Sequence, residues 1–270
     1  MNRPPQRTTR RPVPKPRKPH HRAADGPVES ADKPQRIAKL LARAGIASRR
    51  EVERLIAEGR IAIDGEKVTT PATLLKDLAG VTYDGRPVRP AVASRLYRFH
   101  KRDKTLTAAH DPKGRPTIYD RLPKGLPRLM PVGRLDFLTE GLLLLTNDGE
   151  LKRQLELPRT GLTRTYRVRA FGDVSQEQLE ALSEGITIDG VRYGSIIADM
   201  ERRTGRNCWI EMSLTEGKNR EVRRVLEHLG LQVSRLIRTS YGPFTLEGLA
   251  PGAIDQVDAA ALAEFRKTLK

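Results

Sequence analysis

The sequence predicts an α+β fold, in which a small helix-helix-hairpin unit precedes a larger region built on a mixed, largely antiparallel sheet. Three observations lead to this prediction. In the second half of the chain, short stretches alternate apolar and polar residues, as strands with one buried face do. These stretches cluster, whereas helical patterns are few, which disfavours a regular βαβ repeat. In the first half, Asp64-Gly65 separates two short apolar stretches and favours a two-residue hairpin turn.

Residues 1–33 form a basic tail of Arg, Lys and Pro with almost no apolar side chains. Such a segment buries too little surface to offset the entropy lost on ordering, so we predict that it is disordered. It could act as a solubilising tail or as an arm that grips RNA without sequence preference. The density of positive charge favours the arm.

The helix-helix-hairpin unit is predicted over residues 34–92. Apolar residues at helical spacing start near Gln35 and stop at Gly45, a residue type that commonly terminates helices. The second helix starts at a capping box, in which the side chains of Ser48 and Glu51 bond free amides of the first turn.

Gly59 is expected to end the second helix, and strands at 61–63 and 67–68 then flank the hairpin turn. Basic side chains opposite an apolar stripe often form only a solvated face. Here few acidic residues interrupt them, which favours an RNA-binding surface. The basic residues of this face are Arg36, Lys39, Arg43, Arg49, Arg50 and Arg54.

Residues 94–270 are predicted to form the larger α+β domain, after a flexible joint around residues 85–95. The clearest strands are expected at 166–170 and 208–214, where apolar and polar residues alternate. Helices are expected at 175–184, 219–229 and 259–269.

Composition narrows the class of function. The chain has 270 residues, of which 37% are hydrophobic, so two domains with real cores are possible. A net charge of +17 and a pI near 10.4 indicate a polyanionic partner, and nucleic acid is favoured because no apolar stretch approaches the roughly 20 residues needed to span a membrane. No secretory signal is recognised, and a single cysteine excludes an internal disulfide, which suits the cytoplasm. The scattered histidines suggest no metal site.

The stretch 131–149 (PVGRLDFLTEGLLLLTNDG) is the best candidate for a catalytic loop. It places Arg134 and Asp136 in a loop before four leucines, a run short enough to be a fully buried strand. An aspartate at such a position often only caps a turn. Glu140 and Asp148 could join Asp136 in a paired-carboxylate hydrolase, but their spacing does not favour one shared site.

This stretch resembles the active-site motif of the ribosomal-RNA pseudouridine synthases that modify small-subunit and large-subunit uridines. The first unit, from Ala47-Ser48-Arg49-Arg50-Glu51 to Asp64-Gly65, is similar to the S-four RNA-binding domain. Together these likenesses span about residues 35–252. The positions that match the catalytic motif are Gly133, Arg134, Leu135, Asp136, Thr139, Gly141 and the closing 146–149.

The resemblance implies the roles of several residues. Asp136 matches the catalytic aspartate, and Arg134 matches the arginine that fills the gap left by the flipped uridine. Tyr166 matches the aromatic residue that stacks on the uracil, and Arg223 matches the basic residue that pairs with the aspartate. Leu236, or equally Ile237, matches the aliphatic residue on the other uracil face.

The segment 216–226 (EGKNREVRRVL) forms the third part of the resemblance, and its Lys218 and Arg220 are expected to contact RNA. One segment departs from the family. Where its members have Lys-Pro-x-Gly, this chain has Lys101-Arg102-Asp103-Lys104, which lacks both backbone-shaping residues. The path of that loop is therefore not predicted.

We predict that the protein isomerises uridine to pseudouridine in ribosomal RNA, using the Asp136 carboxylate and neither a cofactor nor a metal. Large-subunit (23S) rRNA is the favoured target. The alternatives are small-subunit (16S) rRNA and a non-catalytic RNA- or ribosome-binding protein. The expected partner is rRNA, either free or in an assembling subunit, and the expected state is a monomer.

Overall fold

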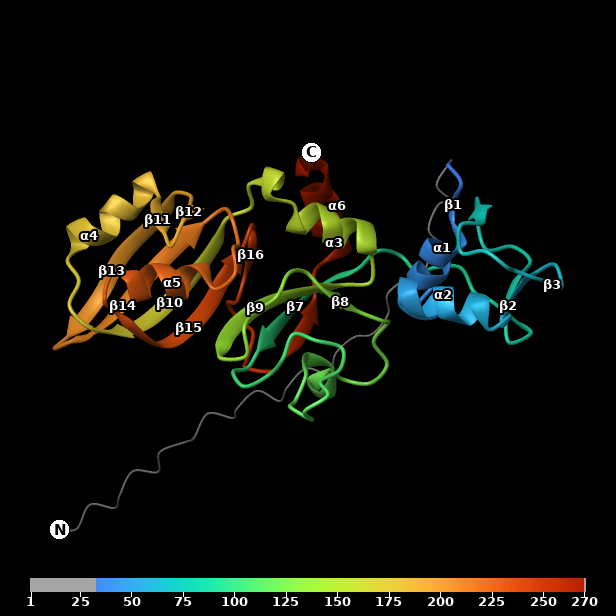
Figure 1. Ribbon diagram of the computed structural model, residues 1–270, viewed down its shortest axis with the longest axis horizontal. Coiled ribbons are helices and arrows are strands. Elements are labelled where there is room, and N and C mark those ends of the chain that lie inside the picture. The colour runs from blue at the N-terminus through green and yellow to red at the C-terminus, as the bar shows by residue number, and fades with distance from the viewer. Residues whose placement is uncertain (1–32, 270) are drawn as a thin grey trace, which may run out of the picture.

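The computed structural model describes residues 33–269 (Figure 1). The tail predicted over residues 1–33 lies, apart from Lys33, outside the described residues. The elements of the N-terminal unit are β1 (Gln35–Arg36), α1 (Ile37–Arg43), α2 (Arg49–Ala57), β2 (Ile61–Ile63), β3 (Glu66–Lys67), β4 (Leu74–Leu75), β5 (Val81–Tyr83) and β6 (Arg86–Pro87).

The predicted helix-helix-hairpin unit is present. The apolar stripes of α1 and α2 form one core with β2 and β5. Asp64 and Gly65 connect β2 to β3 with φ values of 50° and 88°, the left-handed conformation that this hairpin turn requires. The capping box is only half formed: the Ser48 hydroxyl accepts from the Glu51 amide, whereas the Glu51 carboxylate accepts from Arg54, one turn further along the helix.

The sequence prediction missed the second half of this unit. β5 pairs with β2, and β6 pairs with β5, so the sheet has four strands in the order β3-β2-β5-β6. Arg86 and Pro87 therefore belong to this sheet, and the connection to the next strand starts only after them. β5 and β6 are too short to show a clear alternation.

The larger domain contains one nine-stranded sheet, and the predicted α+β class is confirmed. Its elements are β7 (Leu96–Lys101), η1 (Ile118–Arg121), β8 (Met130–Pro131), β9 (Thr139–Thr146), α3 (Gly149–Glu156), η2 (Pro158–Thr160), β10 (Arg164–Phe171), α4 (Gln176–Glu180), η3 (Ala181–Glu184), β11 (Ile186–Ile188), β12 (Val191–Tyr193), β13 (Ile196–Thr204), β14 (Asn207–Leu214), α5 (Glu221–His228), β15 (Gln232–Tyr241), β16 (Phe244–Thr245), β17 (Ile254–Gln256) and α6 (Ala259–Thr268).

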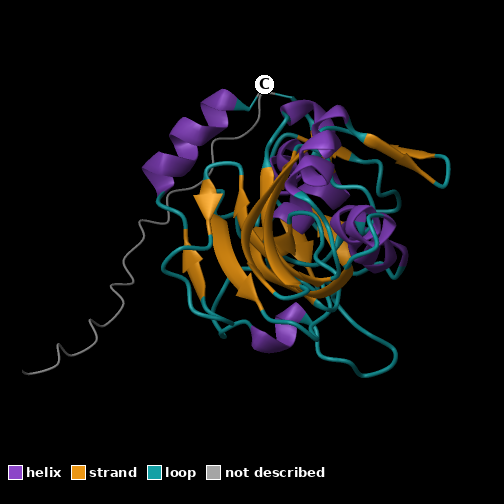
Figure 2. Ribbon diagram, turned by 90° about the vertical axis from the view of Figure 1, so that its left-hand side faces the viewer, coloured by secondary structure: helices purple, strands orange, loops and turns teal. Residues whose placement is uncertain are grey.

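The main path of the sheet is β13-β14-β10-β15-β9-β7-β17, and only β15 and β9 pair in parallel. Figure 2 shows the strong curvature of these strands. The helix predicted at 175–184 is α4 followed by the 3-10 turn η3. The sequence prediction missed α3, whose first-turn amides are bonded by Asp148.

Gly141 allows β9 to approach β15 closely. Its φ is 101°, and a Cβ there would lie 2.3 Å from the carbonyl oxygen of Arg238. The pairing sets Thr139 opposite Leu236, so the loop that precedes β9 lies beside the middle of β15. This crossing brings the candidate catalytic loop onto the sheet.

Candidate active site

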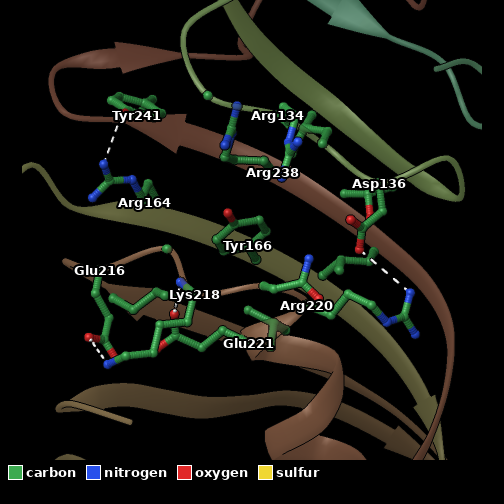
Figure 3. A pocket seen from close by; sticks show the side chains of 18 of the residues that line it. Arg134, Asp136, Arg164, Tyr166, Glu216, Lys218, Arg220, Glu221, Arg238 and Tyr241 are labelled. Atoms are coloured by element: carbon green, nitrogen blue, oxygen red, sulfur yellow. Dashed lines mark hydrogen bonds and ion pairs between the residues drawn. The ribbon is translucent and has the colours of Figure 1, made fainter. Parts of the chain in front are cut away.

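A pocket of about 760 Å³ opens where the loop before β9 meets β10, β15 and the start of α5. Figure 3 shows Tyr166 near its centre, with Arg134 and Arg238 on one side and Lys218 and Glu221 on the other. The predicted site residues that line it are Arg134, Asp136, Tyr166, Lys218, Arg220, Arg223 and Leu236. Arg49 and Arg50 lie elsewhere, exposed at the start of α2.

The loop that carries Asp136 is held by three side chains from outside it. Lys101, fully buried at the end of β7, donates to the carbonyl oxygens of Asp136 (3.0 Å), Thr139 (2.7 Å) and Arg102 (3.0 Å). The Thr107 hydroxyl donates to the carbonyl of Leu135, and the Gly133 amide donates to Glu156. The backbone beneath Asp136 is therefore fixed before any substrate binds.

Burial lowers the pKa of Lys101 to about 8, although Asp103, Asp136 and Glu140 favour its charged form. Lys104, three residues later, has φ +50°. It stands where members of the resembling family have glycine, and it adopts a left-handed conformation at a cost of about 1–2 kcal/mol for a side chain with a Cβ. The segment 101–104 therefore forms a left-handed turn without glycine.

Asp136 forms an ion pair with Arg220, at 3.6 Å between carboxylate and guanidinium. The predicted ion pair of Asp136 with Arg223 is not formed in this structure, although the Asp136 charge still favours the charged form of Arg223. Arg223 is buried and donates to the carbonyl of Leu138 (3.2 Å), because its position on the inner face of α5 points it at the loop backbone. Burial lowers the pKa of Arg223. Arg220, just before α5 and with φ +52°, reaches the carboxylate instead.

Tyr166 and Leu236 face the pocket from neighbouring strands. Tyr166 pairs in register with Arg238, two residues beyond Leu236 on β15, so all three side chains share one face of the sheet. Ile237 lies on the opposite face, which favours Leu236 over Ile237 as the aliphatic wall. Leu236 is buried.

A basic wall closes the pocket beside Tyr166, and the sequence prediction missed it. The Tyr241 ring lies between Arg164 and Arg238, whose guanidinium carbons are 4.6 Å and 5.1 Å from its centroid. Arg164 also donates to the Tyr241 hydroxyl at 2.8 Å. The sequence did contain a signal for both arginines. Residues two apart on a strand share a face, and Arg164 precedes Tyr166 by two residues while Arg238 follows Leu236 by two.

Known proteins share this sequence and fold. Residues 95–228 match the family described as RNA pseudouridylate synthase, and residues 35–77 match the S4 domain. An uncharacterized RNA pseudouridine synthase of Rickettsia bellii is 44% identical over 223 residues, which are 83% of this chain and 96% of that protein. The chain belongs to the RNA pseudouridine synthase family.

Relatives with an assigned name support the same placement. The ribosomal large subunit pseudouridine synthase B of Salmonella typhimurium is 40% identical over 234 residues, covering 84% of this chain and 80% of that protein. Its namesake from Pasteurella multocida is 41% identical and covers 86% and 70%. A crystal structure of a pseudouridylate synthase shares the fold, with a TM-score of 0.59 over 86% of this chain and 99% of that one, at 24% identity.

Two carboxyl groups sit at the edge of this pseudouridine synthase pocket. Burial and, to a smaller extent, the neighbouring Glu216 together raise the pKa of Glu221 to about 8. Burial also opposes ionisation of Glu216, but hydrogen bonds from Glu221, the Gly194 amide and Lys218 outweigh it and lower its pKa. One proton is therefore held between the two groups, on Glu221. Glu221 also accepts from the Lys218 amide at 2.8 Å, which shapes the turn that carries Arg220.

The free energy of unfolding of the native protein should fall as the pH rises from 4.5 to 8, and Glu221→Gln should abolish the part of this fall that Glu221 causes. Folded Glu221 holds its proton up to about pH 8, while the unfolded chain releases it near 4.5, so the folded state binds more protons across this window and stability falls as pH rises. One such group contributes at most about 1.4 kcal/mol per pH unit. Urea unfolding at several pH values measures the slope. The exposed Glu184→Gln is the control, and an unchanged slope in Glu221→Gln would contradict the assignment.

Within the described residues, no cluster of three or more His, Cys, Asp or Glu side chains could hold a metal ion. In the same part of the chain, no helix combines the length and apolar character needed to cross a membrane.

Proposed function

We propose that this RNA pseudouridine synthase modifies a uridine of large-subunit (23S) rRNA and that Asp136 performs the chemistry. The observation that carries the assignment is one pocket that joins the Asp136 carboxylate, the Tyr166 ring and a wall of arginines. The named relatives from Salmonella typhimurium and Pasteurella multocida are large-subunit enzymes, which supports the 23S target. Modification of 16S rRNA is the alternative.

The reaction breaks the bond between N1 of uracil and C1′ of ribose and forms a bond between C5 and C1′, while a proton leaves C5 and one is taken up at N1. No atom is gained or lost. Asp136 attacks C1′ or stabilises the positive charge that develops on the sugar. Tyr166 holds the detached uracil by stacking, and Leu236 packs its other face. Arg220 orients the carboxylate, and the arginine wall attracts the flanking phosphates.

We further propose that residues 34–92 dock the enzyme on rRNA and that residues 94–270 carry the chemistry. Arg49 and Arg50 are exposed at the start of α2, away from the pocket, and can bind phosphates without touching the target base. Two other basic residues of that face are engaged: Arg54 with Glu51, and Lys39 with Glu150 of the larger domain at 3.1 Å. The protein is further proposed to act as a monomer in the cytoplasm.

Mapping pseudouridines in rRNA from cells with and without this protein tests the function. Loss of one pseudouridine from 23S rRNA, restored by the intact chain and not by Asp136→Asn, is the expected result. A loss confined to 16S rRNA would support the alternative. An unchanged map of both rRNAs would overturn the proposal. Repeating the reaction on free rRNA and on an assembling subunit distinguishes the two forms of the substrate.

Substitutions of Arg134 and of Tyr166 should slow the reaction in different ways. A stacked uridine must be flipped out before Asp136 can reach it, at a cost of roughly a few kcal/mol, and exposed Arg134 is placed to fill the vacancy. Arg134→Ala should recover partly when the uridine sits in a bulge, where flipping costs less. Tyr166→Ala should stay impaired on both RNAs, since stacking is worth about 1–3 kcal/mol per base. Single-turnover rates on a paired and a bulged stem decide this, and equal defects of Arg134→Ala on both stems would remove its flipping role.

A further inference from the structure

The face of the sheet opposite the pocket carries a second group of arginine and aromatic side chains. Side chains alternate along β10, so Arg167 and Arg169 point away from the face that holds Tyr166. On β14, Trp209 lies on this second face, directly across from Arg169 on one neighbouring strand and from Arg202 on the other.

Trp209 borders a hollow of about 430 Å³. Arg169, Arg202, Thr204 and Asn207 line the rest of it, so the hollow offers two guanidinium groups, a hydroxyl, an amide and an aromatic ring. Both arginines are exposed, and the Trp209 side chain is half-buried, so all of these groups are accessible from solvent.

Two aromatic rings on this face are each covered by a guanidinium: Trp209, which lines the hollow, and Phe171, which lies opposite Asn207 in register. Arg167 lies 4.6 Å from the centroid of Trp209, and Arg206 lies 4.8 Å from that of Phe171, which is 41% exposed. Surfaces that bind single-stranded nucleic acid combine such groups, with aromatic rings for base stacking and guanidinium groups for phosphates.

The arginines of this face that are not paired with a carboxylate lie at the hollow. Arg167 is paired with Glu201 at 2.6 Å, and Arg206 with Asp173 at 3.1 Å. In the part of the chain that the structure describes, Arg169 and Arg202 form no ion pair with a carboxylate. Two further acids lie on this face, Glu211 opposite Arg167 and Asp199 opposite Glu211 in register, and neither lines the hollow.

We propose that this hollow is a second RNA site, which binds a single-stranded segment of the substrate with a base against Trp209 and phosphates on Arg169 and Arg202. The guanidinium groups match phosphate oxygens, and the Asn207 amide and Thr204 hydroxyl match a base edge or ribose. An acidic peptide would satisfy the arginines and leave the ring unused. The inference rests on the proposed function only in that the substrate is RNA.

Trp209 is the only tryptophan among the 270 residues, so its fluorescence reports this face alone. The probe is a short oligoadenylate, which contains no uridine, titrated into the full-length protein. Saturable quenching is expected. The double variant Arg169→Ala/Arg202→Ala should weaken binding by about tenfold or more and lower the slope of log K against log salt by about 1.4, as two phosphate contacts are lost. The control double variant, Arg153→Ala/Lys267→Ala on α3 and α6, should match the unsubstituted protein.

Three results would overturn the proposal: no quenching, an unchanged affinity of the Arg169→Ala/Arg202→Ala variant, or equal quenching by oligoglutamate, which would mark a general polyanion surface. The proposed function is tested separately. Asp136→Asn should lose isomerisation and keep the quenching, so failure at one site does not imply failure at the other.

Discussion

Asp136→Asn should abolish isomerisation, by at least about 10⁴-fold, while RNA affinity stays close to unchanged. The amide retains the shape of the side chain but removes the negative charge that the proposed chemistry requires. Its ion pair with Arg220 is half-exposed, at 37% and 45% side-chain exposure, so its loss should cost less than about 1 kcal/mol of stability. Single-turnover measurement of pseudouridine formation, with filter binding of the same RNA, gives both quantities.

Asp189→Asn is the matched control for this substitution. Asp189 lies in the exposed turn between β11 and β12, where asparagine tolerates the same left-handed backbone. It should retain full activity. Substantial turnover by Asp136→Asn at normal RNA affinity would remove Asp136 from the chemistry.

Lys101→Met should have the second-largest effect. Three backbone carbonyls lose their buried donor, which should lower the free energy of unfolding by about 1–3 kcal/mol. Activity should fall by more than stability explains, on the order of 10²-fold, because one of those carbonyls belongs to Asp136 and a shift near 1 Å is enough to misalign it. Urea unfolding and single-turnover rates at saturating RNA measure the two effects.

Lys104→Met is the control, since it makes the same change at an exposed position of the same loop and should alter stability by no more than about 0.5 kcal/mol. Equal effects of the two substitutions would refute the anchoring role of Lys101.

The pH dependence of Lys101 gives a second readout. Above pH 8 its amine loses a proton and is left with two hydrogens for three carbonyls, so activity should decline there in the native enzyme and not in Lys101→Met. The sign for stability is opposite. Between pH 8 and 10.5 the unfolded chain binds more protons than the folded one, so the contribution of Lys101 to stability rises with pH.

The sequence alone determined the class of fold and pointed to the candidate catalytic loop. The four leucines at 142–145 form a buried strand, Asp64-Gly65 forms the predicted hairpin turn, and α5 and α6 lie within two residues of their predicted bounds, because these features depend on local periodicity and turn chemistry. The short second hairpin of the first unit was missed, since its stability comes from pairing with β2 rather than from its own pattern.

Only the tertiary structure decided which side chains meet. Arg220 and Arg223 are three residues apart in one basic segment. Because of the way α5 packs against the loop before β9, Arg220 pairs with the Asp136 carboxylate, whereas Arg223 donates to the carbonyl of Leu138. The sequence did not reveal the anchoring role of Lys101, because two of the three carbonyls it bonds belong to a loop more than thirty positions away in sequence. Which charged side chain meets which partner depends on how distant strands and helices pack together. The spacing of residues along the sequence does not encode that packing.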